Sequence, residues 1–420
     1  MKKDLNEWLA FLEQLHPNEI DLGLTRISKV GQALDLINHD AKVITVAGTN
    51  GKGTTCAFLE EILIQAGYQV GVYSSPHIRR YNERLRINHV ELSDQQHCDA
   101  FSKIEIGRGE TSLSYFEYAT LACLALLKEA KCDFIILEVG LGGRLDATNM
   151  VESDISAVTT IGIDHTDWLG NDREKIGFEK AGVFRSDKPA ICGELDPPIS
   201  LQTHAKKISA NIKYAGKDFY ITQGADNWSW TGNKTITNLP MTLMPVQNAS
   251  TALAIIEALS INIPDEIIRQ SLQQAQLAGR LQKLPLKEKA DIYMDVAHNP
   301  QSARYLAEQI QVMKAKKPAS SKVFTIVGML EDKDMTGTFE QVNSYIDECY
   351  LIGLECGRGA SVETLYEHYQ ASSNKQAEAK CFNSIENAYK TVINKADLSD
   401  IIIIFGSFHT VSDFLTFLEG

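Results

Sequence analysis

The sequence lacks a hydrophobic run that could cross a membrane. Its longest apolar stretches, such as residues 401–405, are far shorter than the roughly 20 residues of a membrane-spanning helix. The first four residues, Met-Lys-Lys-Asp, lead into a helical pattern of Trp, Leu and Glu instead of an uninterrupted apolar core, so we expect no secretory signal. We therefore predict a cytoplasmic protein without a membrane partner.

Positive charge is also scarce. The chain has 41 Lys and Arg against 54 Asp and Glu, which gives a net charge of −13. No global basic field is available to hold nucleic acid, and we predict no nucleic-acid partner. An anionic substrate would then need a local basic pocket. Arg79, Arg80, Arg84 and Arg86 either form a solvated face, as charge runs commonly do, or line such a pocket.

Paired cysteines are missing as well. The eight cysteines are scattered along the chain, and no CxxC pair occurs among them. This spacing is typical of reduced thiols in a cytoplasmic protein and gives no sign of a disulfide framework.

What the sequence does contain is a long series of short apolar runs that alternate with amphipathic stretches. Such alternation is typical of βα units around a mainly parallel sheet. A chain of 420 residues is expected to form two or three domains. In the first part we predict strands at 43–47, 70–73, 134–139 and 155–161, and helices at 54–66, 115–130 and 248–259. Residues 217–239 suit a small antiparallel excursion.

A second alternating series occupies the last part of the chain, with strands predicted at 291–296, 323–329, 348–353 and 401–405. Residues 281–289, with one proline and three lysines, have the composition of a connection. We therefore predict an α/β protein with domains at 1–280 and 290–420, joined by a linker at 281–289.

A glycine-rich turn joins the predicted strand at 43–47 to the predicted helix at 54–66. It reads Gly48-Thr49-Asn50-Gly51-Lys52-Gly53-Thr54. A strand, a turn and a helix start in this order aim backbone N–H groups and the positive end of the helix dipole at an anion. Lys52 would reach the terminal phosphates of a nucleotide, and Thr54 would offer its hydroxyl to Mg²⁺. The spacing departs from the usual GxxxxGK[ST], and a plain turn with an exposed lysine is the other interpretation.

The same loop resembles the phosphate loop of the Mur-type amide ligases. Further motifs make the chain similar to one branch of that family, the bacterial bifunctional dihydrofolate synthase/folylpolyglutamate synthases. These motifs are DLGL at 21–24, VAGTNGKGTT at 46–55, VYSSPHI at 72–78, YFEY at 115–118, LEVGLGGRLDATN at 137–149, DHTDWLG at 164–170, EKAGVFR at 179–185, GR at 279–280, DVAHNP at 295–300 and GSFHTV at 406–411. They follow one order along nearly the whole chain, which chance would not supply.

The resemblance implies two α/β domains with the active site in the cleft between them. The N-terminal domain would be a phosphate-loop ATPase domain of the Mur-ligase type, and the smaller C-terminal domain would be Rossmann-like and carry glutamate ligation. ATP, the co-substrate, would phosphorylate the carboxylate of 7,8-dihydropteroate or the γ-carboxylate of a tetrahydrofolate. The amine of L-glutamate would then attack the acyl phosphate. Mg²⁺, as two ions, and a monomeric enzyme are expected with this activity.

The functional residues of the family carry over to matching positions of this sequence. The catalytic positions are Lys52, Lys180 and His298. The ATP contacts are Thr49, Asn50, Gly51, Lys52, Gly53, Thr54, Asn248, Arg280 and Asp295, and the metal ligands are Thr54, Ser75, Glu138 and His165. The pteroate pocket takes Asp21, Leu22, Gly23, Leu24, Ser114, Tyr115, Phe116, Glu117, Leu145, Asp146 and Ala147. Lys180 is also the position at which the family carries a carbamate (N6-carboxylysine).

Elementary chemistry supports the metal ligands unequally. Glu138 stands at the end of a predicted strand near the loop, where α/β sheets place ligands, and carboxylate oxygens suit Mg²⁺. His165 is placed at the end of another strand, but a histidine there is more often a core or rim residue. Ser75 precedes a proline and also fits a turn. For His165 and Ser75 the assignment as metal ligands depends on the match to the family motifs.

The remaining assignments also depend on the resemblance. A carbamate on Lys180 needs an unprotonated amine and hence a lowered pKa, and an ordinary surface lysine is the alternative. Phe116 could stack on a flat heterocycle or belong to the core. His298 could be an ordinary loop histidine.

Other functions compete with this interpretation. A cell-wall Mur ligase would share the chemistry but carry an extra N-terminal domain for a UDP sugar, and we expect the 47 residues before Gly48 to be too few for one. A nucleotide switch or motor would have the standard phosphate loop and nothing like the HNP and DATN motifs. A monofunctional folylpolyglutamate synthase stays open, although DLGL, YFEY and LDA favour a dihydropteroate pocket.

Overall fold

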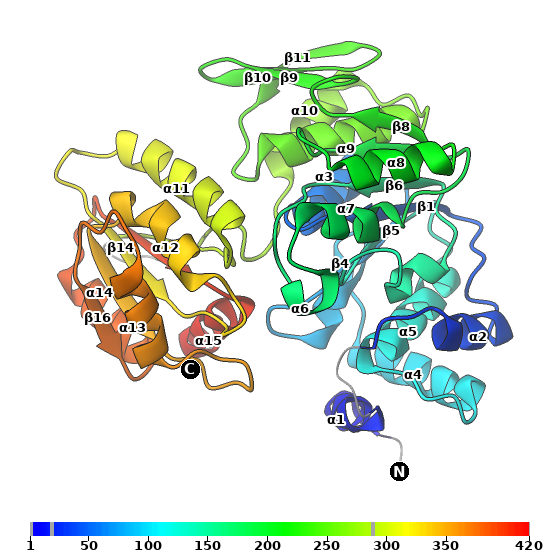
Figure 1. Cartoon of the computed structure of the whole chain (residues 1–420), viewed down its shortest axis with the longest axis horizontal. Helices are drawn as coiled ribbons and strands as arrows, with labels where there is room; N and C mark the ends of the chain where they lie inside the picture. Colours follow the sequence, from blue (N-terminus) through cyan, green and yellow to red (C-terminus); the bar gives the residue numbers. More distant parts are fainter. Residues whose placement is uncertain (1–2, 17–20, 287–289, 420) are drawn as a thin grey trace. The chain divides into compact units, whose positions relative to one another are not determined.

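The computed structural model describes residues 3–16, 21–286 and 290–419 (Figure 1). The chain forms two compact units, Met1–Ala275 and Gln276–Gly420. Of the linker expected at 281–289, residues 287–289 lie outside the described residues, while the short strand β12 (Gln282–Lys283) belongs to the sheet of the second unit.

The first unit is built on a sheet with the order β4-β3-β2-β5-β1-β6-β7-β8. The strands from β2 to β8 in this order are parallel, and β3 and β4 form an antiparallel hairpin at one edge. The strands are β1 (Lys42–Ala47), β2 (Val70–Tyr73), β3 (Leu85–Ile87), β4 (Val90–Glu91), β5 (Phe134–Glu138), β6 (Ile155–Val158), β7 (Pro189–Cys192) and β8 (Asn211–Tyr214). The predicted strands are confirmed, but β6 ends three residues earlier than expected.

Helices cover both faces of this sheet (Figure 1). They are α1 (Leu5–Leu15), α2 (Thr25–Ala33), α3 (Lys52–Gln65), α4 (Asp94–Arg108), α5 (Tyr115–Ala130), α6 (Thr166–Leu169), α7 (Arg173–Ala181), α8 (Ile199–Lys207), α9 (Val246–Ala258) and α10 (Asp265–Gln274), with the 3₁₀ turns η1 (Tyr81–Arg84) and η2 (Ala147–Met150). The helix predicted at 115–130 is confirmed. It begins there because Ser114 and Glu117 form a capping box, in which each side chain bonds the other's backbone N–H.

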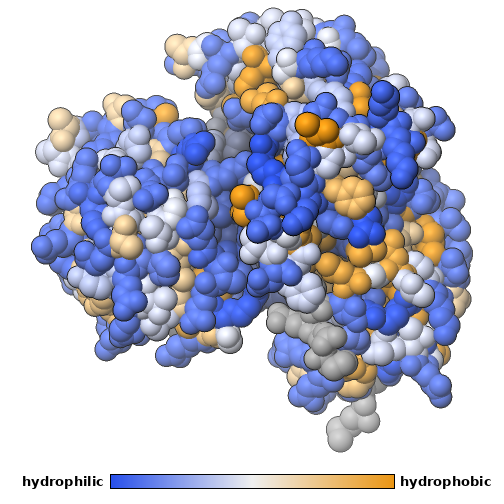
Figure 2. Space-filling view, viewed as in Figure 1, coloured by the Kyte–Doolittle hydropathy of each residue, from blue (hydrophilic) through white to orange (hydrophobic). Residues whose placement is uncertain are grey.

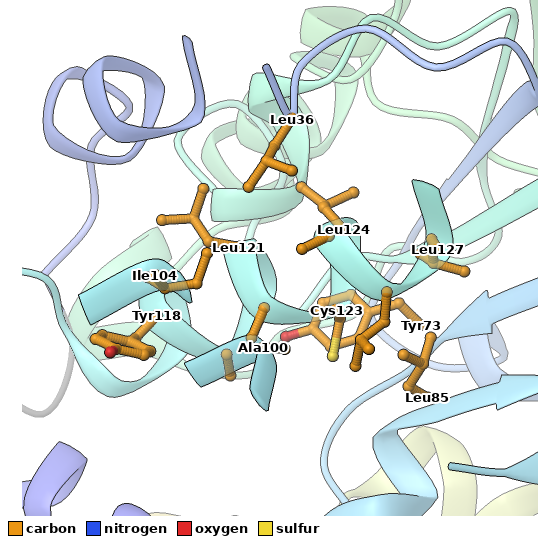
Figure 3. Close-up of a cluster of buried hydrophobic side chains, with 14 of the residues drawn as sticks. Leu36, Tyr73, Leu85, Ala100, Ile104, Tyr118, Leu121, Cys123, Leu124 and Leu127 are labelled. Carbon is orange, nitrogen blue, oxygen red and sulfur yellow. The ribbon is translucent and has the colours of Figure 1, made fainter. Parts of the chain in front are cut away.

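The side chains of β1 show why both faces are covered. Val43 belongs to a large buried cluster with α4 and α5, in which Tyr73, Cys123 and Leu127 lie together (Figure 3). Ile44 and Val46 point the other way, as alternate strand residues do, toward the side on which α3 packs. Every residue of α3 from Thr54 to Leu63 is buried, so other elements must cover the side of this helix that faces away from the sheet. The helices α9 and α10 pack against it there.

A separate antiparallel sheet, ordered β11-β10-β9, follows β8. Its strands are β9 (Tyr220–Gln223), β10 (Asn227–Thr231) and β11 (Thr235–Pro240). Two tryptophans of β10, Trp228 and Trp230, are buried. The excursion predicted at 217–239 is therefore confirmed.

The second unit contains a sheet with the order β12-β13-β17-β14-β15-β16, parallel except for β12. Its other strands are β13 (Asp291–Met294), β14 (Val323–Val327), β15 (Glu348–Ile352), β16 (Ala379–Phe382) and β17 (Ile401–Phe405). Its helices are α11 (Pro300–Ala315), α12 (Met335–Val342), α13 (Val362–Ala371), α14 (Ile385–Lys395) and α15 (Phe408–Glu419), and η3 (Asn343–Tyr345) is a 3₁₀ turn. The four predicted strands are confirmed, and Ile401 and Ile403 join the core formed with α11, α12 and α13.

The face shown in Figure 2 is mainly hydrophilic, with groups of hydrophobic residues among the hydrophilic ones. Trp168 and Phe178 are exposed and belong to the lining of a hollow formed by α6, α7 and α8. That hollow contains none of the residues predicted to bind nucleotide, metal or pteroate. In the described part of the chain, no helix combines the length and apolarity that a membrane crossing requires.

Candidate active site

The phosphate loop follows the central strand β1, and α3 begins at Lys52 directly after it. Gly51 precedes the helix with a φ of 85°, a conformation that favours glycine. A Cβ at this position would lie 2.5 Å from Oδ1 of Asn248, which is closer than atoms pack. Asn248 in turn donates from Nδ2 to Oγ1 of Thr54 at 2.6 Å. The predicted ATP contact on α9 thus touches the predicted metal ligand on α3.

A second segment, just beyond β6, holds the other side of the loop. The backbone N–H of Thr49 donates to the carbonyl of Thr160 at 2.7 Å, and that of Asn50 donates to the Thr160 hydroxyl at 3.1 Å. Thr159 donates its hydroxyl to the carbonyl of Asn50 at 2.6 Å. These bonds fix the loop before any ligand binds, which is the preorganisation that a phosphate site requires.

Two lysines converge on one carbonyl oxygen of the loop. Nζ of Lys52 and Nζ of Lys180 each donate to the carbonyl of Gly48 at 3.0 Å, and Lys52 also donates to Thr49 at 3.2 Å. Lys180 is buried on α7. Burial, and after it the nearby charge of Lys52, lowers the pKa of Lys180 to about 7, although Asp164 and Asp146 oppose the shift. A substantial share of this amine is therefore unprotonated at neutral pH.

Glu138 is the last residue of β5, beside β1, and is only 6% exposed. Because β5 lies between β1 and β2 in the sheet, Glu138 stands between the strand that leads into the phosphate loop and the β2–β3 edge. Ser75 follows β2 and precedes Pro76 in a cis peptide bond. Its neighbour Ser74 accepts a hydrogen bond from Nη1 of Arg86 at 3.1 Å. Two predicted oxygen ligands of the metal, Glu138 and Ser75, thus lie at the carboxyl ends of the adjacent parallel strands β5 and β2.

His165 does not stand at the end of a strand, as the sequence had suggested. The strand β6 ends at Val158, and His165 lies seven residues later. It is the N-cap residue of α6 and has a left-handed backbone conformation (φ 52°). The strand ends early because Thr159 and Thr160 direct their hydroxyls to the phosphate loop. Among the described residues, no three His, Cys, Asp or Glu side chains form a metal-binding group on their own. The predicted set contains two residues of these types, Glu138 and His165, and two hydroxyls, those of Thr54 and Ser75.

The predicted pteroate residues come from three segments that contact one another. Asp21 precedes α2, and Glu117 is buried in the first turn of α5. Arg26 links them, because its Nη1 donates to Oδ2 of Asp21 at 2.6 Å and its Nη2 donates to both carboxylate oxygens of Glu117 at 3.2 Å. Residues 21–24 remain partly exposed. The DLGL and YFEY motifs therefore form one surface.

Phe116 connects this surface to the third segment. Its ring stacks on Tyr73 with centroids 6.1 Å apart and lies against Gly140, where a Cβ would be 2.6 Å from Cζ of the ring. Asp146 accepts hydrogen bonds from the N–H of Leu141 and from Thr148, and burial raises the pKa of its carboxyl group against these bonds. Its carboxylate shapes the turn that carries Leu145, partly buried, and Ala147, at the start of η2.

Three further predicted residues lie together in the second unit. Asp295 directly follows β13 and accepts hydrogen bonds from the N–H groups of Leu281 and Ala297 at 2.8 and 2.7 Å. Burial raises the pKa of Asp295, while the charges of Arg280 and, less strongly, His298 lower it. The guanidinium of Arg280 lies 5.3 Å from the Phe408 ring centroid. Nδ1 of His298 bonds the carbonyl of Val296 at 2.8 Å, which orients the imidazole.

Comparison of the sequence with protein-family models identifies the family. The model of the Mur ligase middle domain matches residues 46–259, and that of the Mur ligase glutamate ligase domain matches residues 279–408. The dihydrofolate synthase/folylpolyglutamate synthase of Escherichia coli is 44% identical over 99% of this chain and 96% of its own length. The corresponding protein of Haemophilus influenzae is 43% identical over 99% and 98%. The chain belongs to the Mur ligase family, in its dihydrofolate synthase/folylpolyglutamate synthase branch.

Solved structures of this branch have the same fold. Escherichia coli FolC in complex with DHPP and ADP is 44% identical, with a TM-score of 0.94 over 99% of this chain and 98% of that one. A bifunctional folylpolyglutamate synthase/dihydrofolate synthase with Mn, AMPPNP and L-glutamate bound is 47% identical, with a TM-score of 0.91 over 100% and 98%. The predicted two-domain α/β architecture of the Mur ligase type is therefore confirmed.

Sequence reasoning missed several residues that build the site in this family member. Arg26 joins two pteroate segments, and its position two residues after DLGL was the available signal. Thr159 and Thr160 hold the phosphate loop, and their adjacent hydroxyls after a buried strand could have indicated it. These signals are weak, and the partners of Arg26, Thr159 and Thr160 become visible only in the folded chain.

Proposed function

We propose that this protein joins L-glutamate to 7,8-dihydropteroate and adds further γ-linked glutamates to tetrahydrofolates, with ATP as co-substrate. It is then an ATP-dependent acid–amino-acid ligase of folate biosynthesis that works in the cytoplasm. The observation that carries the proposal is the combination of a preorganised GTNGKG loop with full-length similarity to dihydrofolate synthase/folylpolyglutamate synthases. All eight cysteines are free thiols, which supports a reducing compartment.

The reaction would proceed in two displacements. A carboxylate oxygen of the acceptor attacks the γ-phosphorus of ATP, the bond to the bridging oxygen breaks, and ADP leaves. The amine of L-glutamate then attacks the acyl carbon, phosphate leaves with the carbonyl–oxygen bond pair, and the amine loses a proton. The first displacement develops charge on the transferring phosphoryl oxygens, so fixed cationic and N–H donors should contribute most to catalysis.

In this scheme the loop residues 49–54 and Asn248 bind the nucleotide phosphates from the first unit, with Lys52 directed at the transferring group. For Arg280, Asp295 and His298 of the second unit we propose the nucleotide-binding and catalytic roles that the family motifs give them. The bonds of the loop to Thr159, Thr160 and Asn248 support this assignment because they fix the backbone at residues 49 and 50 and the hydroxyl of Thr54.

Mg²⁺, as two ions, would be held by Thr54, Ser75, Glu138 and His165. The chemistry of these donors fits the ion, since hydroxyl and carboxylate oxygens are hard ligands and Glu138 is a buried carboxylate at a strand end. The metal would supply charge neutralisation at the phosphates. The solved relatives were obtained with Mn and AMPPNP, which supports a divalent cation beside a nucleotide.

The acceptor would lie on the surface made by residues 21–24, 114–117 and 145–147. Its flat heterocycle suits the aromatic ring of Phe116, whose position is fixed by Tyr73 and Gly140. Lys180 would carry a carbamate. The buried position and lowered pKa of its amine support this modification, since only the unprotonated amine can react with CO₂.

The decisive experiment measures ADP release by the purified protein with ATP, Mg²⁺ and L-glutamate. Dihydropteroate and tetrahydrofolate are offered in separate reactions, and UDP-muramyl peptides serve as the control acceptor. We expect turnover with both folate acceptors. Turnover with tetrahydrofolate alone would reduce the protein to a monofunctional folylpolyglutamate synthase, and turnover with the muramyl peptides alone would refute the proposal.

A further inference from the structure

The four arginines between residues 79 and 86 have different environments. Arg80 is exposed and pairs with Glu91 at 2.7 Å. Arg86 is largely buried and pairs with the buried Glu60 at 2.9 Å. Arg84 is only 8% exposed, yet no carboxylate of the described residues pairs with it. The run is therefore neither a uniform solvated face nor a uniform wall, and Arg84 differs from its neighbours.

The guanidinium of Arg84 is held in a fixed orientation. Its Nε donates to Nδ1 of His77 at 2.8 Å. Its central carbon lies 5.6 Å from the ring centroid of Tyr115 and 5.8 Å from that of Tyr81. These contacts fix the plane of the group, but they leave the two terminal amino groups, Nη1 and Nη2, without a hydrogen-bond acceptor among the described residues.

Such an arrangement leaves the two terminal amino groups, which are not among the fully buried polar atoms, open to a ligand. A buried charge needs a counter-charge or a full set of hydrogen bonds, and the attraction of two aromatic rings compensates only in part. The two terminal amino groups of a guanidinium form a fork that matches the two oxygens of a carboxylate. The geometry therefore indicates a site for an anionic group with two coplanar oxygens.

The position of Arg84 identifies which anion this is. Tyr115, over which the guanidinium lies, belongs to the proposed pteroate segment and precedes Phe116. On the other side, the carbonyl of Arg84 accepts the N–H of Ser74 at 2.9 Å, next to the proposed metal ligand Ser75. Arg84 thus stands between the residues assigned to the heterocycle and those assigned to the phosphate end. In a pteroate molecule, the carboxylate is the group that must occupy this interval.

We propose that Arg84 binds the carboxylate of the acyl acceptor through paired hydrogen bonds from Nη1 and Nη2, with His77 as a positioning residue. This inference rests on the proposed function and deepens it. The guanidinium would hold the attacking carboxylate in place and would select acceptors that end in an arylcarboxylate. The rings of Tyr81 and Tyr115, which lie edge to face at an interplanar angle of 84°, would hold the guanidinium between them.

The test compares two ligands that differ only in the group concerned. Affinities for pteroate and for its carboxamide analogue, pteroamide, are measured by titration calorimetry with the wild-type protein, Arg84→Gln and Arg84→Lys. Arg80→Gln is the matched control, since it removes a charge from the same run at an exposed position. Thermal unfolding of each variant verifies that it is folded.

We expect Arg84→Gln to weaken pteroate binding by about 10- to 100-fold, as loss of a charge-assisted pair does, and to leave pteroamide binding within about twofold. Arg84→Lys should restore only part of the loss, and Arg80→Gln should change neither affinity. Equal weakening of both ligands, or unchanged pteroate binding, would overturn the inference while the proposed function stands. A wild-type protein that binds neither ligand would overturn both.

If Arg84→Gln does not fold, the wild-type protein alone still decides the question. A preference for pteroate over pteroamide of about tenfold or more supports a cationic fork at the carboxylate. Equal affinities for the two ligands overturn it.

Discussion

Nζ of Lys180 donates a hydrogen bond to the carbonyl oxygen of Gly48 at 3.0 Å, across 132 residues of sequence. The carbonyl belongs to the phosphate loop, and the lysine is buried on α7. An unprotonated amine can make this bond as well as an ammonium can, because each carries N–H donors. The contact therefore keeps Lys180 at the phosphate site in either protonation state and permits chemistry on the nitrogen lone pair.

The first prediction concerns the carbamate on Lys180. The lone pair of Nζ forms a bond to the carbon of CO₂ and one N–H proton is released, so modification requires the neutral amine. With a pKa of about 7, uptake should rise as the pH increases through 7, whereas an ordinary lysine would stay protonated there. Carbon-13 NMR of protein equilibrated with labelled bicarbonate should show one slowly exchanging carbamate signal.

The control for this experiment is Lys180→Ala, which should lose the signal, and Lys175→Ala, an exposed lysine on the same helix, which should keep it. A signal that survives in Lys180→Ala would assign the carbamate elsewhere.

The second prediction is a pH dependence of stability. The pKa of Lys180 is lowered from 10.5 to about 7 in the folded chain, so between these values the unfolded chain binds more protons than the folded chain. The free energy of unfolding should therefore rise with pH relative to Lys180→Met, by about 5 kcal/mol over the whole window and by about 3 kcal/mol between pH 6.5 and pH 9.5. Urea unfolding of both proteins at pH 6.5 and pH 9.5 in CO₂-free buffer measures it. If the free energies of unfolding of the two proteins changed equally with pH, the folded chain would tolerate the charged ammonium of Lys180.

The sequence allowed the ends of the parallel strands to be placed well, because apolar runs and glycine-rich turns are local signals. Glu138 stands at the carboxyl end of β5, and Lys52 and Thr54 lie in the first turn of α3, after the glycine-rich turn that follows β1. His165 was misplaced because Thr159, Thr160 and Ile161, which are β-branched residues common in strands, continue the run after the strand ends at Val158. Whether such a run continues as strand depends on Thr159 and Thr160 bonding the phosphate loop, which is a contact between distant segments.

Charge partners were the least predictable part of the site. Arg80, Arg84 and Arg86 look alike in sequence, yet one pairs with a partly buried glutamate, one with a fully buried glutamate, and one with no carboxylate of the described residues. The difference arises from α3 and β4, which bring Glu60 and Glu91 to two of them. No window of the sequence around residue 84 contains that information.

The third prediction tests the role of Lys52 at the phosphates. Lys52→Ala should lower kcat by about 10²–10³-fold, because a fixed cationic donor to the transferring group is lost, while the fold survives. ADP release and thermal unfolding are measured on the same preparation. Lys175→Ala provides the exposed control. Unchanged kcat in Lys52→Ala would refute the assignment of the loop.

The fourth prediction concerns the left-handed glycine at the start of α3. Gly51→Ala should weaken ATP binding by about tenfold or more, since the new Cβ would displace Asn248 and with it the hydroxyl of Thr54. Gly67→Ala is the matched control, because Gly67 has a similar φ of 92° but no atom within 4 Å of the added Cβ. Both variants should lose about 1–2 kcal/mol of stability from backbone strain, and only Gly51→Ala should lose nucleotide affinity.

The last prediction concerns Arg26, which connects Asp21 to the buried Glu117. Replacement by Gln would leave the carboxylate of Glu117 without its cation and would release the DLGL segment from α5. We expect KM for dihydropteroate to rise about tenfold or more while the Kd of ATP stays unchanged, because the phosphate loop has no bond to Arg26. Arg108→Gln removes a comparable pair with Glu105 on the same unit and should leave both constants unchanged. A variant in which ATP affinity falls as much as dihydropteroate affinity would show that Arg26 supports the whole unit and not the acceptor surface.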